Sequence, residues 1–245
     1  MGEAQPLSIR PESASAVVIC LHGFTGTPHE VAPAESANGH SGLAAVAPTL
    51  PGHGFAERER QRQAFANLRS ADLLTAARQE IARAHQHYDR VGMLGFSMGG
   101  AIALTMAAEG RLEACAVVAP ALRLPLKAEV LIPLLGWASF QLDAPNPMPG
   151  YDFHHSHALQ ALWRVGKAAR RQLDRIQIPV LGIHSHNDHT IPPTVLPLME
   201  SRIPVPLETA WFDDSDHVML LDNSGAAVAE RVTAFFQQQF GASGA

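Results

Sequence analysis

The chain has 245 residues, of which 47% are hydrophobic and 17% are charged, so it can bury the core of one α/β domain or two small ones. Its formal net charge of −5 argues against a nucleic-acid-binding protein or one held by acidic lipid. The first residues lack the apolar segment of a signal peptide, and no apolar stretch is long enough to span a bilayer, so we expect a cytoplasmic protein without stable membrane anchoring.

Short apolar stretches alternate with helix-like segments along the chain. Strands are predicted within residues 16–23, 43–54, 90–95, 113–121, 178–185 and 206–217. Helices are predicted within residues 28–42, 70–88, 100–110 and 224–240. Apolar strands that alternate with helices indicate an α/β fold, in which a mostly parallel sheet has helices on both faces.

Residues 122–176 interrupt this alternation. They contain many prolines and no stretch that predicts a strand, with helix-like pieces near 126–141 and 155–175. We expect a helical cap inserted over the carboxyl edge of the sheet, between the two parts of a core domain formed by 1–121 and 177–245. A long irregular connection is the alternative, although loops of such length without secondary structure are uncommon.

A candidate nucleophile lies in the sequence Gly-Phe-Ser-Met-Gly, which surrounds Ser97. The pattern G-x-S-x-G is common, but here it joins a predicted strand to a predicted helix, as the nucleophile turn of a serine hydrolase does. Such a turn exposes the serine oxygen at the start of the helix, where partial positive charge favours developing negative charge. The alternative is a glycine-rich turn with a capping serine.

A serine nucleophile needs a base, and a histidine base needs an acid that orients it. His217 follows the last predicted strand, and Asp188 follows the preceding one within the stretch HSHNDH. The carboxyl ends of parallel strands meet at one edge of a sheet, so we predict that Ser97, His217 and Asp188 form a catalytic triad. Three rival acids lie so close to His217 in sequence that we expect them to shape its loop: Asp213, Asp214 and Asp216.

The stretch HSHNDH also allows a second interpretation. Read as H-x-H-x-D-H, it resembles the zinc-binding motif of the metallo-β-lactamase superfamily. That family places the motif early in the chain and needs further ligands downstream, whereas only His217 follows this stretch. We therefore predict no metal site, and expect His184, His186 and His189 to be structural or solvated.

Acyl transfer requires donors for an oxyanion. The stretch LHGFTG follows the first strong strand, and its backbone can offer the N–H of Phe24. The residue after the nucleophile offers the N–H of Met98. His22 is expected to be structural, because a sharp turn is needed after the strand in either case.

With these residues in place, the chain resembles the α/β-hydrolase superfamily from about residue 15 to 240. The stretches LHGFTGTPHE, PTLPGHG, GFSMGG and DHVMLLD are similar to the small bacterial carboxylesterases grouped with monoacylglycerol lipases. The resemblance implies hydrolysis of a small-molecule ester with a short or medium acyl chain, without a cofactor. Transfer to another acceptor, or cleavage of a thioester, amide or carbon–carbon bond, remains an alternative.

The cap sequence also suggests where an acyl chain would bind. Five apolar residues are candidates for lining the acyl pocket: Leu131, Leu134, Leu135, Trp137 and Phe140. Packing between the cap and the core is the equally good alternative for these side chains.

Overall fold

The computed structural model describes residues 3–135, 137–144 and 150–241. Seven strands form one sheet, in the order β1-β3-β2-β4-β5-β8-β9. These strands are β1 (Leu7–Ile9), β2 (Ala16–Leu21), β3 (Ala44–Ala47), β4 (Arg90–Phe96), β5 (Ala114–Val118), β8 (Val180–His184) and β9 (Leu207–Trp211). All neighbours pair in parallel except β1, which is antiparallel to β3 at one edge. The predicted mostly parallel sheet is therefore confirmed.

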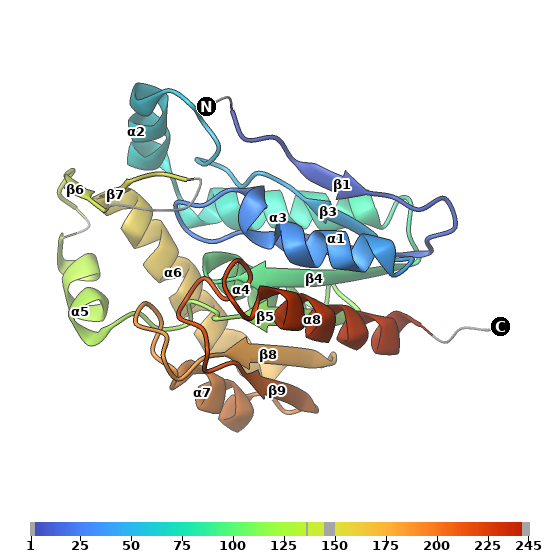
Figure 1. Ribbon diagram of the computed structural model, residues 1–245. Helices are drawn as coiled ribbons and strands as arrows, with labels where there is room; N and C mark the ends of the chain where they lie inside the picture. The colour runs from blue at the N-terminus through green and yellow to red at the C-terminus, as the bar shows by residue number, and fades with distance from the viewer. Residues whose placement is uncertain (1–2, 136, 145–149, 242–245) are drawn as a thin grey trace.

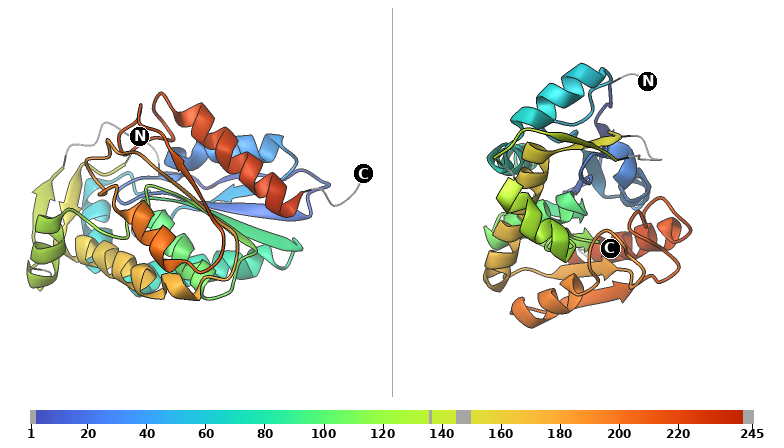
Figure 2. Two further views of the ribbon diagram at one scale, coloured as in Figure 1. Left: turned by 90° about the horizontal axis from the view of Figure 1, so that it is seen from below. Right: turned by 90° about the vertical axis from the view of Figure 1, so that its left-hand side faces the viewer.

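Helices cover both faces of the sheet (Figures 1 and 2). One face packs against α1 (Ala32–His40) and α8 (Gly225–Phe240), and the other against α3 (Ser70–Ala84), α4 (Met98–Ala108) and α7 (Val195–Arg202). Helix α6 (Ser156–Gln172) lies on the second side and packs on α4. The remaining helices are η1 (Pro28–Val31), α2 (Arg58–Asn67), α5 (Leu126–Leu135) and η2 (Leu173–Arg175).

Strand β2 shows why these strands are apolar at every position. Its side chains alternate between the two faces, and all six residues are buried. Val17, Ile19 and Leu21 join the apolar cluster on the α3–α4 side, whereas Val18 and Cys20 join the cluster on the α1–α8 side. Cys20 is a buried free thiol.

Residues 122–176 contain two helices and a small hairpin. The prediction of no strand there was wrong, because β6 (Gln141–Asp143) and β7 (Phe153–His155) pair with each other in antiparallel fashion. Each strand has only three residues, too few for an alternating pattern to be visible in the sequence. Helix α5 and this hairpin lie beyond the strand ends at the left of Figure 1, whereas α6 runs back along α4.

Helix α6 packs closely on the core. Gly166 lies against the backbone oxygen of Ala121, where a Cβ would collide, and Ala158, Ala161 and Val165 are buried in the α3–α4 cluster. We propose that residues 122–176 form an insertion in which α5, β6 and β7 make the cap, while α6 anchors it to the core.

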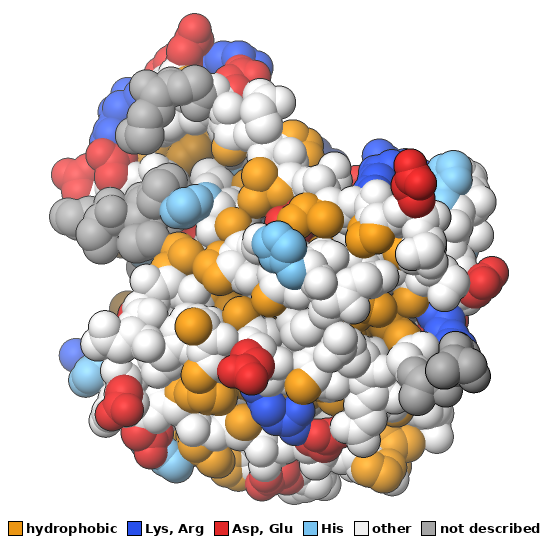
Figure 3. Space-filling model, turned by 45° about the vertical axis from the view of Figure 1, so that its right-hand side comes forward, with side chains coloured by type: hydrophobic (Ala, Val, Ile, Leu, Met, Phe, Trp, Pro, Cys, Tyr) orange, Lys and Arg blue, Asp and Glu red, His pale blue; other side chains and the backbone are white. Residues whose placement is uncertain are grey.

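On the face shown in Figure 3, acidic and basic side chains lie in small mixed clusters, and the described residues form no broad basic area there. Within the described chain, no helix is both long and apolar enough to cross a membrane.

Candidate active site

Ser97 sits on a tight turn between β4 and α4. Its backbone has φ 51° and ψ −111°, a conformation that costs a non-glycine residue on the order of 1–3 kcal/mol. Two glycines make the turn possible. A Cβ on Gly95 would collide with the backbone of Gly99, and a Cβ on Gly99 would collide with the backbone oxygen of Leu21. Strand and helix therefore approach each other at contacts that no larger residue permits.

The turn places the serine hydroxyl next to an imidazole. Ser97 Oγ lies 3.0 Å from His217 Nε2, and His217 Nδ1 lies 2.8 Å from Asp188 Oδ2. Since an ionised carboxylate only accepts hydrogen bonds, Nδ1 carries the proton and Nε2 is left to accept the serine O–H. Phe96 supports the ring from one side, with centroids 5.1 Å apart. The structure thus brings together the three residues that the sequence selected.

Asp188 is buried, yet its negative charge is well compensated. Its other oxygen, Oδ1, accepts the backbone N–H groups of Thr190 and Ile191, each at 2.8 Å. Burial alone would raise the pKa of this carboxyl, but the hydrogen bond from His217 and those two amides outweigh it and hold the pKa below its ordinary value. Asp188 therefore stays ionised beside the histidine.

The three other histidines of HSHNDH have separate surroundings. His184 is fully buried, and burial lowers its pKa; its Nδ1 accepts the N–H of Ser185. His186 pairs with Asp213 and stacks on Trp211, whereas His189 pairs with Asp216. Among the residues that the structure describes, no three metal-binding side chains converge.

Two of the rival acids serve the loop that carries His217. Asp213 accepts the backbone N–H of His186, and Asp216 accepts the backbone N–H groups of His189 and His217. Neither hydrogen-bonds the ring of His217. Their contacts match the loop-shaping role expected for them.

The loop after β2 is fixed by two hydrogen bonds of the His22 ring. Leu50 N–H donates to His22 Nε2 at 3.0 Å, so Nδ1 carries the ring proton and donates to the carbonyl oxygen of Gly23 at 2.9 Å. Burial lowers the pKa of His22 to about 3, which keeps the ring neutral. In a trans peptide the N–H points opposite to the C=O, so the N–H of Phe24 points away from His22.

The second candidate donor is at the start of helix α4. Met98 is the first residue of this helix, and the N–H groups of a first turn have no partner within the helix. The helix dipole adds partial positive charge at that point. Phe24 and Ser97, the residue directly before Met98, both line one cavity.

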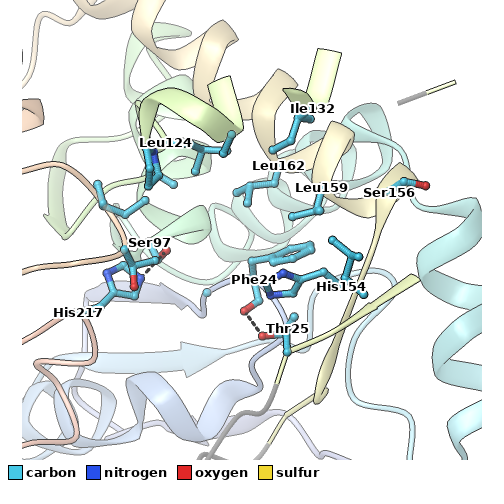
Figure 4. A pocket seen from close by; sticks show the side chains of 18 of the residues that line it. Phe24, Thr25, Ser97, Leu124, Ile132, His154, Ser156, Leu159, Leu162 and His217 are labelled. Atoms are coloured by element: carbon cyan, nitrogen blue, oxygen red, sulfur yellow. Dashed lines mark hydrogen bonds between the residues drawn. The ribbon is translucent and has the colours of Figure 1, made fainter. Parts of the chain in front are cut away.

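A cavity of about 780 Å³ opens above the serine, between the sheet edge and the cap (Figure 4). Its size is in the range of binding sites for small molecules. Apolar side chains dominate its wall, and those from the cap and from α6 include Leu124, Ala128, Leu131, Ile132, Phe140, Leu142, Leu159 and Leu162. Such a wall can bind the apolar part of a substrate whose reactive group lies at Ser97.

The structure corrects part of the predicted acyl pocket. Leu131 and Phe140 line the cavity, as expected. Leu134 and Trp137 do not line it, because their side chains face solvent, with 62% and 83% of their surfaces exposed. The side chain of Leu135 lies outside what the structure describes.

Sequence reasoning missed the contribution of α6 to this cavity. Leu159 and Leu162 lie three residues apart, so they share one face of the helix and both reach the cavity. That spacing was a usable signal. His154 also reaches the cavity from β7 and lies beside the ring of Phe24, which no pattern in the sequence indicated.

The model of the alpha/beta hydrolase family matches residues 18–231. The chain belongs to this family. It is a hydrolase with the mostly parallel sheet of the family, as the sequence predicted.

Individual relatives cover nearly the whole chain. A thermostable monoacylglycerol lipase of Bacillus sp. (strain H-257) is 28% identical, over 94% of each protein. A solved structure described with the metagenome-derived lipolytic enzymes LipS and LipT is 26% identical, with a TM-score of 0.87 over 96% of this chain and 98% of that one.

A more distant structure shares the fold alone. A soluble variant of the monoglyceride lipase of Saccharomyces cerevisiae, in complex with a substrate analogue, is 14% identical, with a TM-score of 0.79 over 96% of this chain and 90% of that one. The predicted resemblance to lipolytic members of the family is therefore confirmed by sequence and by structure.

Proposed function

We propose that the protein hydrolyses carboxylic esters of short or medium acyl chains through an acyl-enzyme on Ser97. The observation that carries this proposal is the chain of contacts from Ser97 Oγ through His217 to Asp188, at 3.0 and 2.8 Å. Both distances are within hydrogen-bonding range, and each member has the partner that its role requires.

In the first half of the reaction, His217 Nε2 takes the proton of Ser97 as Oγ attacks the ester carbonyl. The carbonyl oxygen becomes negative and accepts hydrogen bonds from the N–H groups of Phe24 and Met98. His217, now positive and held by ionised Asp188, gives its proton to the leaving alcohol. The acyl group remains on Ser97.

In the second half, water enters the position that the alcohol has left. His217 takes a proton from the water, whose oxygen attacks the acyl-enzyme, and the same two amides hold the second oxyanion. The proton then returns to Ser97 as the acid departs. This scheme uses only side chains and backbone of the described site and needs neither a metal nor an organic cofactor.

We infer that the acyl chain lies against the apolar wall that α5 and α6 provide. Leu131, Ile132, Leu159 and Leu162 offer contacts to methylene groups, each of which contributes about 0.8 kcal/mol when it is fully buried. Monoacylglycerols are natural candidates, since the relative from Bacillus is a monoacylglycerol lipase.

The proposal is tested with p-nitrophenyl esters of rising acyl length, followed by monoacylglycerols of the same lengths. We expect kcat/KM to rise with acyl length while the cavity still has room, and then to fall. Ser97→Ala should lower kcat by a factor on the order of 10⁶ without changing the fold. If this variant kept a tenth of the wild-type turnover, Ser97 would not be the nucleophile.

A further inference from the structure

Glu30 is a buried carboxyl that the triad does not use. It lies in η1 directly after the loop that carries Phe24, and only 5% of its surface is exposed. Its side chain turns back under the loop and reaches the cavity wall. Burial of a carboxyl group is costly unless the group is hydrogen-bonded, paired with a positive charge or neutral.

The carboxyl group supports the loop at two points. Glu30 Oε2 accepts the backbone N–H of Gly23 at 2.8 Å. Gly26 lies so close to the same carboxyl that a Cβ there would collide with it. The loop from Gly23 to Gly26 is thus wrapped around the end of the Glu30 side chain.

These contacts act on the peptide that offers the Phe24 amide. That peptide joins Gly23 to Phe24, and its carbonyl is already held by His22. The Gly23 N–H is the adjacent polar group along the backbone, and Glu30 fixes it. With both groups fixed, the Gly23–Phe24 peptide has little freedom to rotate, so the direction of the Phe24 N–H is set before substrate arrives.

The charge of Glu30 matters because few ions surround it. The loop contributes neutral His22, and the cavity wall contributes His154 and the His217–Asp188 pair; no lysine or arginine is among the described residues of that wall. Burial raises the pKa of Glu30 to about 7, against a smaller opposing effect of the Gly23 hydrogen bond. An ionised Glu30 therefore places uncompensated negative charge behind the loop that must stabilise an oxyanion.

We propose that Glu30 is a positioning residue for the oxyanion loop, that it holds the Gly23 amide through a neutral carboxyl, and that its ionisation slows acyl transfer. The inference rests on the proposed function of the same site. Neutral Glu30 keeps an oxygen for Gly23 and adds no charge, whereas ionised Glu30 opposes the negative charge that develops on the substrate.

Two substitutions separate the hydrogen bond from the charge. Glu30→Gln keeps an acceptor oxygen and cannot ionise, and Glu30→Ala removes the acceptor. Loss of a whole oxyanion donor costs 10²–10³ in kcat, and Glu30 acts only through the loop, so we expect Glu30→Ala to lower kcat about tenfold. KM should change less than threefold, because ground-state contacts are kept.

The matched control is Glu35→Ala. Glu35 is a buried glutamate of the neighbouring helix α1, 4% exposed, and it does not line the cavity. We expect its kcat to stay within twofold of the wild type. If Glu30→Ala matched this control, or if Glu30→Gln were as impaired as Glu30→Ala, the positioning role would be wrong.

The pH profile supplies a readout that simple packing would not change. Wild-type kcat/KM on one p-nitrophenyl ester should decline on the alkaline side of neutrality, and Glu30→Gln should remove that decline. An alkyl trifluoromethyl ketone, which forms a tetrahedral adduct with a reactive serine, should follow the same pattern in its affinity. Identical alkaline profiles for wild type and Glu30→Gln would refute the effect of the charge.

Stability provides a test that does not need activity. The folded protein holds the pKa of Glu30 above its ordinary value, so the stabilisation from the protonated form is complete below about pH 4.5 and is lost as the pH rises through about 7. The melting temperature of the wild type should therefore fall relative to that of Glu30→Gln between pH 5 and pH 8. A constant difference would contradict the titration of Glu30, whether or not the protein cleaves esters.

An active wild type and an inactive Ser97→Ala uphold the proposed function. If that outcome is found and Glu30→Ala has the same kinetics as the wild type, only the inference about Glu30 is overturned. A wild type without esterase activity overturns the proposed function, and the melting temperatures then decide the titration of Glu30 separately.

Discussion

Replacement of Asp188 by Asn tests the triad most sharply, because the structure dictates how the new side chain must lie. Two backbone N–H groups, those of Thr190 and Ile191, donate to Oδ1 at 2.8 Å each. An asparagine can satisfy them only with its carbonyl oxygen at that position. Its NH₂ group then occupies the place of Oδ2, which lies 2.8 Å from His217 Nδ1.

The amide reverses the hydrogen bond to the histidine. An NH₂ group only donates, so Nδ1 must become the acceptor and the ring proton moves to Nε2. Nε2 then faces Ser97 Oγ with a proton of its own and cannot accept the serine proton. We expect kcat to fall by a factor on the order of 10⁴, equivalent to about 5.5 kcal/mol in the activation free energy.

The assay is steady-state hydrolysis of one p-nitrophenyl ester by wild type, Asp188→Asn and a control. Asp216→Asn is the matched control, because Asp216 accepts the backbone N–H of His217 but does not hydrogen-bond its ring. The control should keep kcat within a few-fold of the wild type. If Asp188→Asn retained more than a tenth of the wild-type kcat with an unchanged circular dichroism spectrum, the assignment of Asp188 would fail.

Further predictions concern the same site. Gly99→Ala should lower the free energy of unfolding by about 1–3 kcal/mol in a denaturant titration, because its Cβ would press on the backbone oxygen of Leu21; unchanged stability would refute that reading of the turn. Dialysis against a chelator should leave activity unchanged, and replacement of His186 or His189 by serine should alter kcat less than threefold; loss of activity that zinc restores would favour the metal interpretation instead.

Much of the candidate site was predictable from local sequence. The turn at Ser97 needs glycine on both sides, since side chains at Gly95 and Gly99 would collide with neighbouring backbone. A requirement of that kind is imposed by a few adjacent residues, so it is visible in a short motif. Asp188 and His217 each follow a late strand, which made them candidates for the other two roles, and the structure places them in contact with each other.

The sheet was also predictable, because its strands are buried on both faces and are therefore apolar at every position, as β2 illustrates. Shorter elements were not. Strand β1 has three half-exposed or exposed residues, and helix α2 buries only Phe65, so neither shows a clear apolar period. Strand β1 and helix α2 form because they pack on neighbouring parts of the fold. Such contacts leave no regular spacing of apolar residues in the sequence.

The sequence by itself determined the fold class, the strained serine turn and the identities of the three residues that meet there. Only the tertiary structure decided which cap residues face the cavity, since Leu131 and Trp137 are both large and mainly apolar, yet Leu131 lines the cavity and Trp137 is exposed. It also decided that Glu30 bends back to the Gly23 amide and is removed from water. The physical reason is that backbone strain and strand burial are imposed by nearby residues, whereas the wall of a cavity depends on the packing of segments far apart in the chain.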